Sequence, residues 1–250
     1  MAAGITRRHA ILLMTTDLNV TTHGFTDGDA QAVALAERIA GELRNALSER
    51  GHALLAVSGG STPKAFFARL SLEKLDWPNV VITLVDERWV PDSDERSNAR
   101  LVETTLLKNA AASASFVPLY TDAPTPEDGL ATTTARITAL KLPFDAVVLG
   151  MGDDGHTASF FPGGDRLADA LDLAGTAPVV PMRAPDAGEP RITLSLPTLL
   201  NTRSLFLLVA GEKKRDVLAD ARLGLGPARD YPVRAVLTQD RVPVSVYWCP

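Results

Sequence analysis

His156, with Asp153 and Asp154 just before it, is the residue in this sequence best placed for chemistry. These side chains belong to the stretch GMGDDGHTASFFPG at 150–163, which directly follows the apolar run at 146–149. A carboxylate two residues before a histidine can orient the imidazole ring and stabilise its protonated form. A lone histidine is more often structural, but one beside an aspartate at the end of a buried strand predicts proton transfer.

Glycines surround these side chains in the same stretch. We expect unusual backbone angles at all three, which would aim the residues between them into a site: Gly150, Gly152 and Gly155.

The turn SGGSTP at 58–63 is a second polar feature at the end of a predicted strand. Gly59 and Gly60 let the backbone turn its N–H groups inward, and the helix that follows adds the positive end of its dipole, so the turn can cradle a phosphate. The hydroxyls of two further residues can add donors: Ser61 and Thr62. A Gly-Gly turn can equally be only a tight connection, and both interpretations stay open. Since the Lys-Ser or Lys-Thr of a Walker loop is absent, nucleoside triphosphates are disfavoured.

Charged residues follow another predicted strand in DERWVPDSDERSN at 86–98. A charge cluster is usually a solvated loop, but the rigid apolar triplet at 89–91 favours fixed positions for Asp86 and Arg88. Further cations stand in PRITLSLP, which contains Arg191, and in VAGEKKRD. The lysine pair in VAGEKKRD follows a predicted strand and a glycine, so one of the two is expected near the site. The alternative is a basic first helical turn that faces water, which the helix dipole disfavours unless something such as a bound anion compensates. That pair is Lys213 and Lys214.

Other catalytic patterns do not occur in the sequence. No histidine has a second histidine or cysteine at metal-ligand spacing, so we expect no metal and no cofactor. There is no Gly-Xaa-Ser-Xaa-Gly elbow, and Cys249 stands one residue from the last position, badly placed for a nucleophile. Activated water is therefore a simpler attacking group than a protein side chain.

Short apolar runs alternate with helical patterns along most of the chain. Strands are expected within 52–60, 79–87, 144–152, 204–211 and 244–249. Helices are expected from after the capping candidates Asp27 and Asp29 to Gly51, and over about 62–70, 97–110, 126–141 and 212–223. Apolar strands separated by helices predict an α/β fold with an open, mostly parallel sheet and helices on both faces. We expect one domain over 1–250, with surface loops at 173–190 and 223–233.

Composition and charge limit the partners. With 250 residues, 46% of them hydrophobic, and a formal charge of −5, the chain can bury a large core but has no general attraction for nucleic acid or anionic lipid. An anionic ligand therefore needs a local site, which favours a small molecule. The run at 10–14 is too short for a signal peptide, no run suggests a membrane helix, and the single cysteine suits a reducing cytoplasm. We expect a soluble cytoplasmic protein.

Taken together, SGGSTP, DERWVP with SN following, GMGDDGHTASFFPG and RITLSLP resemble the 6-phosphogluconolactonase family in order and spacing, from about 53 to 214. The resemblance implies an open α/β sheet like that of glucosamine-6-phosphate deaminases and, more distantly, ribose-5-phosphate isomerases. It also implies hydrolysis of 6-phosphoglucono-1,5-lactone to 6-phosphogluconate, the second step of the oxidative pentose phosphate pathway.

Two alternatives are weighed against this resemblance. Deaminases typically continue the histidine with Ile-Ala-Phe-Asn-Glu-Pro, so their glutamate is replaced here by Phe161, and their usual tyrosine by Arg88. Both differences favour the lactonase. A sugar-phosphate sensor would need an output module, and no helix-turn-helix segment or basic face is evident. One departure from the family, MRAPDAGEP at 182–190, leaves open whether Arg183 or Arg191 meets the phosphate.

The resemblance also implies roles for the residues above. Phosphate would dock on the four residues of the glycine turn, with charge-assisted contacts from two cations: Gly59, Gly60, Ser61, Thr62, Arg191 and Lys214. His156 would take a proton from water, Asp154 would stabilise the imidazolium, and Arg88 would stabilise the oxyanion. Asp86 and Asp153 are expected to line the site. The expected assembly is a monomer or a weak homo-oligomer.

Overall fold

Seven parallel strands form the main sheet of the computed structural model, which describes residues 19–185 and 187–250. The strand order is β1-β10-β9-β6-β2-β3-β5. Their bounds are β1 Val20–Gly24, β2 Ala53–Val57, β3 Val80–Leu84, β5 Ser115–Val117, β6 Ala146–Gly150, β9 Leu205–Ala210 and β10 Val244–Cys249. Every residue of β2 is buried, so both faces of the sheet are covered there. The predicted fold class is confirmed.

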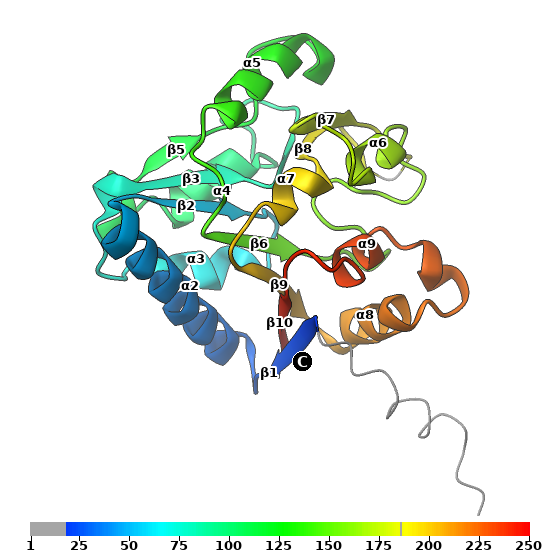
Figure 1. The fold of residues 1–250 in the computed structure, drawn as a ribbon, viewed down its shortest axis with the longest axis horizontal. Helices are drawn as coiled ribbons and strands as arrows, with labels where there is room; N and C mark the ends of the chain where they lie inside the picture. Colours follow the sequence, from blue (N-terminus) through cyan, green and yellow to red (C-terminus); the bar gives the residue numbers. More distant parts are fainter. Residues whose placement is uncertain (1–18, 186) are drawn as a thin grey trace, which may run out of the picture.

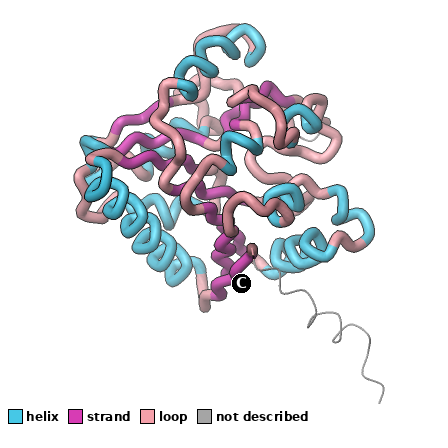
Figure 2. The backbone as a smooth tube through the Cα atoms, in the orientation of Figure 1, coloured by secondary structure: helices cyan, strands magenta, loops and turns pink. Residues whose placement is uncertain are grey.

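Helices cover the sheet in two layers (Figures 1 and 2). The chain moves toward the β5 edge through β1, β2, β3 and β5, then back through β6, β9 and β10. Right-handed crossovers in opposite directions put their helices on opposite faces. The first layer holds α2 Gly28–Arg50, α3 Pro63–Leu70 and α4 Asn98–Thr105. The helices that follow as the chain returns lie in the second layer: α5 Pro126–Thr138, α6 Leu167–Leu171, α7 Leu196–Leu200, α8 Glu212–Leu223 and α9 Val233–Leu237.

A second, antiparallel sheet adjoins the carboxyl end of β3 and was not expected. It consists of β4 Asp86–Arg88, β8 Arg191–Leu194 and β7 Val179–Met182, in the order β4-β8-β7. The prediction of a surface loop over 173–190 is therefore wrong, because β7 is buried within it. Pro181 is tolerated because β7 is an edge strand. The predicted loop at 223–233 also contains a short 3₁₀ helix, Gly226–Asp230.

The topology creates a crevice between β2 and β6. These strands are neighbours, but the chain leaves β2 toward β3 and leaves β6 toward β9, on the other side. Ligands of open α/β sheets bind at such switch points, outside the carboxyl ends of the strands. The glycine turn at 58–62 follows β2, and the histidine loop at 151–163 follows β6.

Among the described residues, no helix is both long enough and apolar enough to span a bilayer. The segment at 7–14, on which the expectation of no signal peptide rests, lies outside the described residues.

Candidate active site

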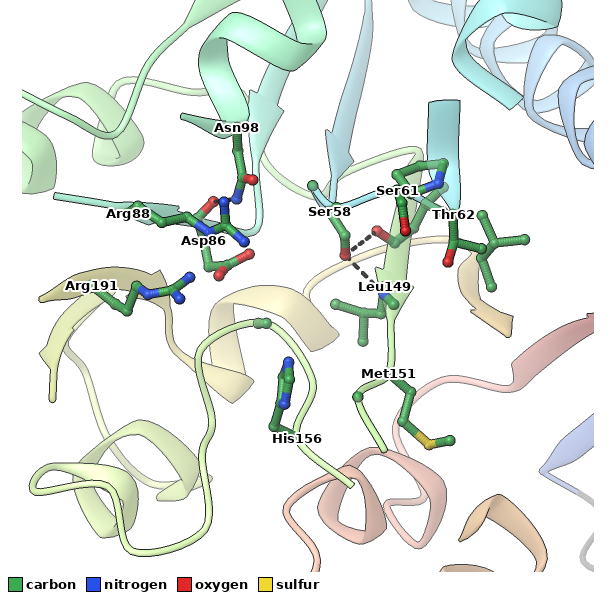
Figure 3. Close-up of a pocket in the computed structure, with 18 of the residues that line it drawn as sticks. Ser58, Ser61, Thr62, Asp86, Arg88, Asn98, Leu149, Met151, His156 and Arg191 are labelled. Atoms are coloured by element: carbon green, nitrogen blue, oxygen red, sulfur yellow. Dashed lines mark hydrogen bonds between the residues drawn. The ribbon is translucent and has the colours of Figure 1, made fainter. Parts of the chain in front are cut away.

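A cavity of about 310 Å³ opens at this switch point (Figure 3). Its walls come from the turn after β2, from β4 and the start of α4, from the loop after β6, from β8 and from the start of α8. The polar and charged residues that line it are Ser58, Ser61, Thr62, Asp86, Arg88, Asn98, His156, Arg191 and Lys214. Most of the residues predicted from separate motifs therefore meet at one place.

The glycine turn presents free hydrogen-bond donors to the cavity. Within the described residues, no acceptor is found for the backbone N–H groups of the four turn residues, Gly59, Gly60, Ser61 and Thr62. Thr62 is the N-cap of α3, and its side chain makes no capping bond. Unpaired amides at a helix N-terminus form a ready anion site. Gly60 has a φ of 95°, so the turn needs glycine there for its backbone conformation.

His156 is held by Asp154, as the spacing predicted. The ring Nδ1 lies 2.6 Å from Asp154 Oδ1, and the same oxygen accepts the His156 backbone N–H at 3.1 Å. Partial burial acts to raise the pKa of the Asp154 carboxyl, but the hydrogen bond and charge of His156 outweigh it and the pKa lies below its ordinary value. A carboxylate can only accept, so Nδ1–H is the donor to Asp154, and in the neutral ring Nε2 is then the acceptor left for the cavity. Figure 3 shows the ring pointing into the cavity.

The backbone of the histidine loop differs from expectation. Of the three glycines thought to need unusual angles, only Gly155 has a positive φ, of 76°. Gly152 is needed for space, since a Cβ there would lie 2.3 Å from the His156 ring. Ala158 has a φ of 47° and lines the cavity. A left-handed alanine is uncommon, and such strain clusters at functional sites.

Two arginines face each other across the small sheet beside Asp86. Arg88 in β4 pairs directly with Arg191 in β8. Like charges at paired positions destabilise a sheet, so the arrangement indicates an anion site. The Nε atoms of both arginines are buried without a hydrogen-bond partner among the described residues. Burial lowers the pKa of the Arg191 guanidinium and Arg88 lowers it further, whereas Asp86 acts in the opposite direction.

Asp86 and Phe161 shape the wall between these arginines and His156. The Asp86 carboxylate accepts a hydrogen bond from Ser159 Oγ at 2.6 Å. The Phe161 ring lies 4.6 Å from the His156 ring between centroids, and the Arg191 guanidinium lies 5.4 Å from its centre. Phe161 therefore packs against both His156 and Arg191 but carries no titratable proton.

The structure separates the alternatives among the basic residues. Arg191 and Lys214 line the cavity. Arg183 instead forms an ion pair with Glu127 outside it. Lys213 donates to Asp153 at 2.8 Å, and this hydrogen bond lowers the pKa of the Asp153 carboxyl. Asp153, expected to line the site, is not among the residues of the cavity wall.

Two polar residues of the wall were not predicted from the sequence, Ser58 and Asn98. Ser58 Oγ donates to the Val148 carbonyl at 3.1 Å and accepts the Gly150 N–H at 2.8 Å, which joins the ends of β2 and β6 (Figure 3). Asn98 donates to the backbone carbonyl of Asp86 at 3.0 Å. The Ser-Asn pair in the motif at 86–98 was the available signal for Asn98. Among the described residues, no cluster of three metal-ligating side chains is present.

Fold and site together define a class of α/β proteins with a cavity at a switch point of the sheet, in which backbone amides and arginines lie beside a carboxylate-held histidine. A family model described as "Glucosamine-6-phosphate isomerases/6-phosphogluconolactonase" matches residues 26–248. The 6-phosphogluconolactonase of Rhizobium meliloti is 48% identical over 93% of this chain and 100% of its own length. That of Pseudomonas aeruginosa is 44% identical over 88% and 91%.

Solved structures agree. The crystal structure of a 6-phosphogluconolactonase from Shewanella baltica has a TM-score of 0.87 and 41% identity, covering 92% of this chain and 98% of that one. The chain belongs to the glucosamine-6-phosphate isomerase/6-phosphogluconolactonase family, and its relatives at this identity are 6-phosphogluconolactonases. A monomeric glucosamine-6-phosphate deaminase, at 18% identity and a TM-score of 0.73, shares the fold.

Proposed function

We propose that the protein hydrolyses 6-phosphoglucono-1,5-lactone to 6-phosphogluconate, the second step of the oxidative pentose phosphate pathway. The observation that carries this proposal is the placement of a carboxylate-held histidine in the same cavity as a turn of free backbone amides. The formal charge of the chain is −5, yet three cations line this cavity against one carboxylate: Arg88, Arg191 and Lys214 against Asp86. An anionic sugar fits that contrast.

The histidine loop can supply both proton transfers. The phosphate binds the turn amides with Arg191 and Lys214, which places the lactone ring toward His156. His156 Nε2 takes a proton from water while the water oxygen bonds to C1, and Arg88 stabilises the oxyanion that forms. The intermediate collapses with cleavage of the bond between C1 and the ring oxygen. The imidazolium returns its proton to that oxygen, and the new carboxylic acid loses its own proton to solvent.

Asp154 and Phe161 support hydrolysis over deamination. Asp154 remains ionised and stabilises the imidazolium between the two transfers. Phe161 lies against His156 where the deaminase motif has glutamate, so no second acid–base group stands at that position. All the residues of this mechanism come from one chain, so a monomer would contain the complete site. The buried single cysteine suits a reducing cytoplasm.

The test compares the wild type with His156→Ala on 6-phosphogluconolactone generated in the assay, with the spontaneous rate subtracted. We expect fast hydrolysis in the wild type and a loss of about 10² to 10⁴ in kcat in the variant, because general base catalysis contributes that much. Product affinity, measured by calorimetry with 6-phosphogluconate, should change little. Equal activity in the variant would overturn the role of His156.

A wild type with no rate above background would instead overturn the hydrolytic function. Ammonia release from glucosamine 6-phosphate would then test deamination. Binding of 6-phosphogluconate without turnover of either substrate would indicate a sensor.

A further inference from the structure

Glu87 fixes the start of α4 to strand β4. Its carboxylate is fully buried and accepts four hydrogen bonds. Oε1 accepts the N–H groups of Arg88 at 2.7 Å and Asn98 at 2.8 Å. Oε2 accepts the N–H of Ala99 at 2.8 Å and the hydroxyl of Ser97 at 3.1 Å. The backbone of Asn98 therefore has a fixed position relative to the strand that carries Arg88.

The side chain of Asn98 extends from this anchor to the glycine turn. It is 3% exposed, and its Nδ2 donates to the Asp86 carbonyl at 3.0 Å. A Cβ added to Gly59 would lie 1.8 Å from Asn98 Oδ1 and 2.2 Å from its Cγ. Real Cβ atoms do not approach so closely. Gly59 has no positive φ, so the need for glycine there is one of space and not of backbone conformation.

We propose that Asn98 is a positioning residue that sets the distance between the phosphate-binding turn and strand β4, with its amide in the place of the side chain that Gly59 lacks. The kinetic part of this proposal rests on the proposed function. A substrate held by its phosphate on the turn must place its carbonyl against Arg88 and His156. A displacement of about 1 Å in such a site can cost about 10²-fold in rate. Fixing this separation is therefore a catalytic requirement that Asn98 meets without touching the reacting atoms.

A double-mutant cycle tests the contact between Gly59 and the Asn98 side chain. Gly59→Ala, Asn98→Ala and the double variant are compared in kcat/KM on 6-phosphogluconolactone and in free energy of unfolding. We expect Gly59→Ala to lower kcat/KM by about 10² and Asn98→Ala by about tenfold. Removal of the amide makes room for the new methyl group, so the double variant should be at least about fivefold more active than Gly59→Ala, a coupling typical of residues in contact.

Gly60→Ala is the matched control. Gly60 has a φ of 95°, and a Cβ there would meet nothing within 4 Å. Alanine at this position is therefore unfavourable because of the backbone conformation and not because of a steric clash. Asn98→Ala should not rescue Gly60→Ala. Multiplicative losses for Gly59→Ala and Asn98→Ala would overturn the proposal. Coupling in unfolding free energy alone would overturn the positioning role, because it would show a packing contact only.

Two further measurements keep the proposal testable if Gly59→Ala does not fold or the wild type does not hydrolyse the lactone. Asn98→Leu keeps the shape of the side chain but cannot donate to the Asp86 carbonyl. We expect it to lower kcat by about three- to tenfold, the net worth of a hydrogen bond, while affinity for inorganic phosphate is kept. An unchanged kcat would overturn the positioning role. If the wild type does not hydrolyse the lactone, the same double-mutant cycle can be measured in affinity for inorganic phosphate. It then still tests the contact between Gly59 and Asn98, so failure of this proposal can be told apart from failure of the proposed function.

Discussion

The two ends of the cavity differ in the chemical groups that form them. The phosphate end consists of backbone amides at the start of α3, with cations added from β8 and α8. The proposed reacting end consists of side chains: Arg88 on strand β4, and His156 and Asp154 on a loop, 33% and 46% exposed. Backbone donors at a helix start are fixed by the fold, whereas a loop histidine needs a partner to hold its ring. Anchoring and chemistry are therefore separable, and substitutions at the two ends should change different kinetic constants.

Joining residues keep these ends at a fixed distance. Ser58 ties the end of β2 to the end of β6, and Asn98 lies between the glycine turn and β4. Both act on backbone groups. These contacts connect several of the six segments that form the site, although its catalytic loop is partly exposed.

The largest effect expected at the reacting end, apart from loss of His156, comes from Asp154→Asn. An amide cannot stabilise the imidazolium and can hold the ring in the wrong tautomer, which costs about 10⁴ in the buried triad of serine proteases. Asp154 is half exposed, so we expect a loss of about 10 to 10³ in kcat with an unchanged affinity for 6-phosphogluconate.

Steady-state kinetics and calorimetry check this prediction. Asp153→Asn measures the neighbouring carboxylate, which contacts Lys213, and should lower kcat by less than about threefold because exposed pairs contribute little. A rise in KM without a fall in kcat for Asp154→Asn would contradict the separation of the two ends.

Much of the fold could be predicted because its strands are buried on both faces. Apolar runs indicated β2, β3, β6, β9 and β10, and α8 occupies the predicted range. Strand β1 reads VTTHG and is largely polar, so its sequence resembles a loop. The strands of the small sheet have three or four residues each. Such short strands are defined by their partners across the sheet, which no local pattern contains.

The site divides in the same way. His156, Asp154 and the glycine turn could be predicted because each follows a strand, and strand ends converge in a parallel sheet. The pairing of Arg88 with Arg191 could not, because it depends on the small sheet. The role of Asn98 toward Gly59 joins residues 39 positions apart in sequence, 98 minus 59, and only their contact in space reveals it.

At the phosphate end, Arg191→Met should raise KM and leave kcat nearly unchanged. Loss of a hydrogen bond to a charged group costs about 1.5–3 kcal/mol, which corresponds to about 10- to 150-fold in KM. Arg191→Lys should recover part of this loss, since it restores the charge without the planar fork. Steady-state kinetics and calorimetry with inorganic phosphate measure both changes. A fall in kcat at constant KM would place Arg191 with the reacting end instead.

Arg183→Ala gives the smallest expected effect and is the control for Arg191, because Arg183 also carries a charge in the same segment but pairs with Glu127 outside the cavity. Its KM should equal that of the wild type. The hydrogen bond from Arg183 lowers the pKa of Glu127 to about 2. The Arg183 and Glu127 side chains are 42% and 43% exposed, so the pair should contribute less than about 1 kcal/mol to the free energy of unfolding.

The pH dependence of that small contribution has a definite sign. Glu127 is a carboxyl whose pKa is lower in the folded state, so its contribution is complete above its ordinary pKa of 4.5 and disappears as the pH falls toward 2. The unfolding free energies of the wild type and Arg183→Ala should therefore differ at pH 7 and converge at low pH in denaturant titrations. A raised KM in Arg183→Ala, with the difference in stability independent of pH, would mean that this arginine leaves Glu127 to bind substrate, and the phosphate end would then extend beyond the cavity described above.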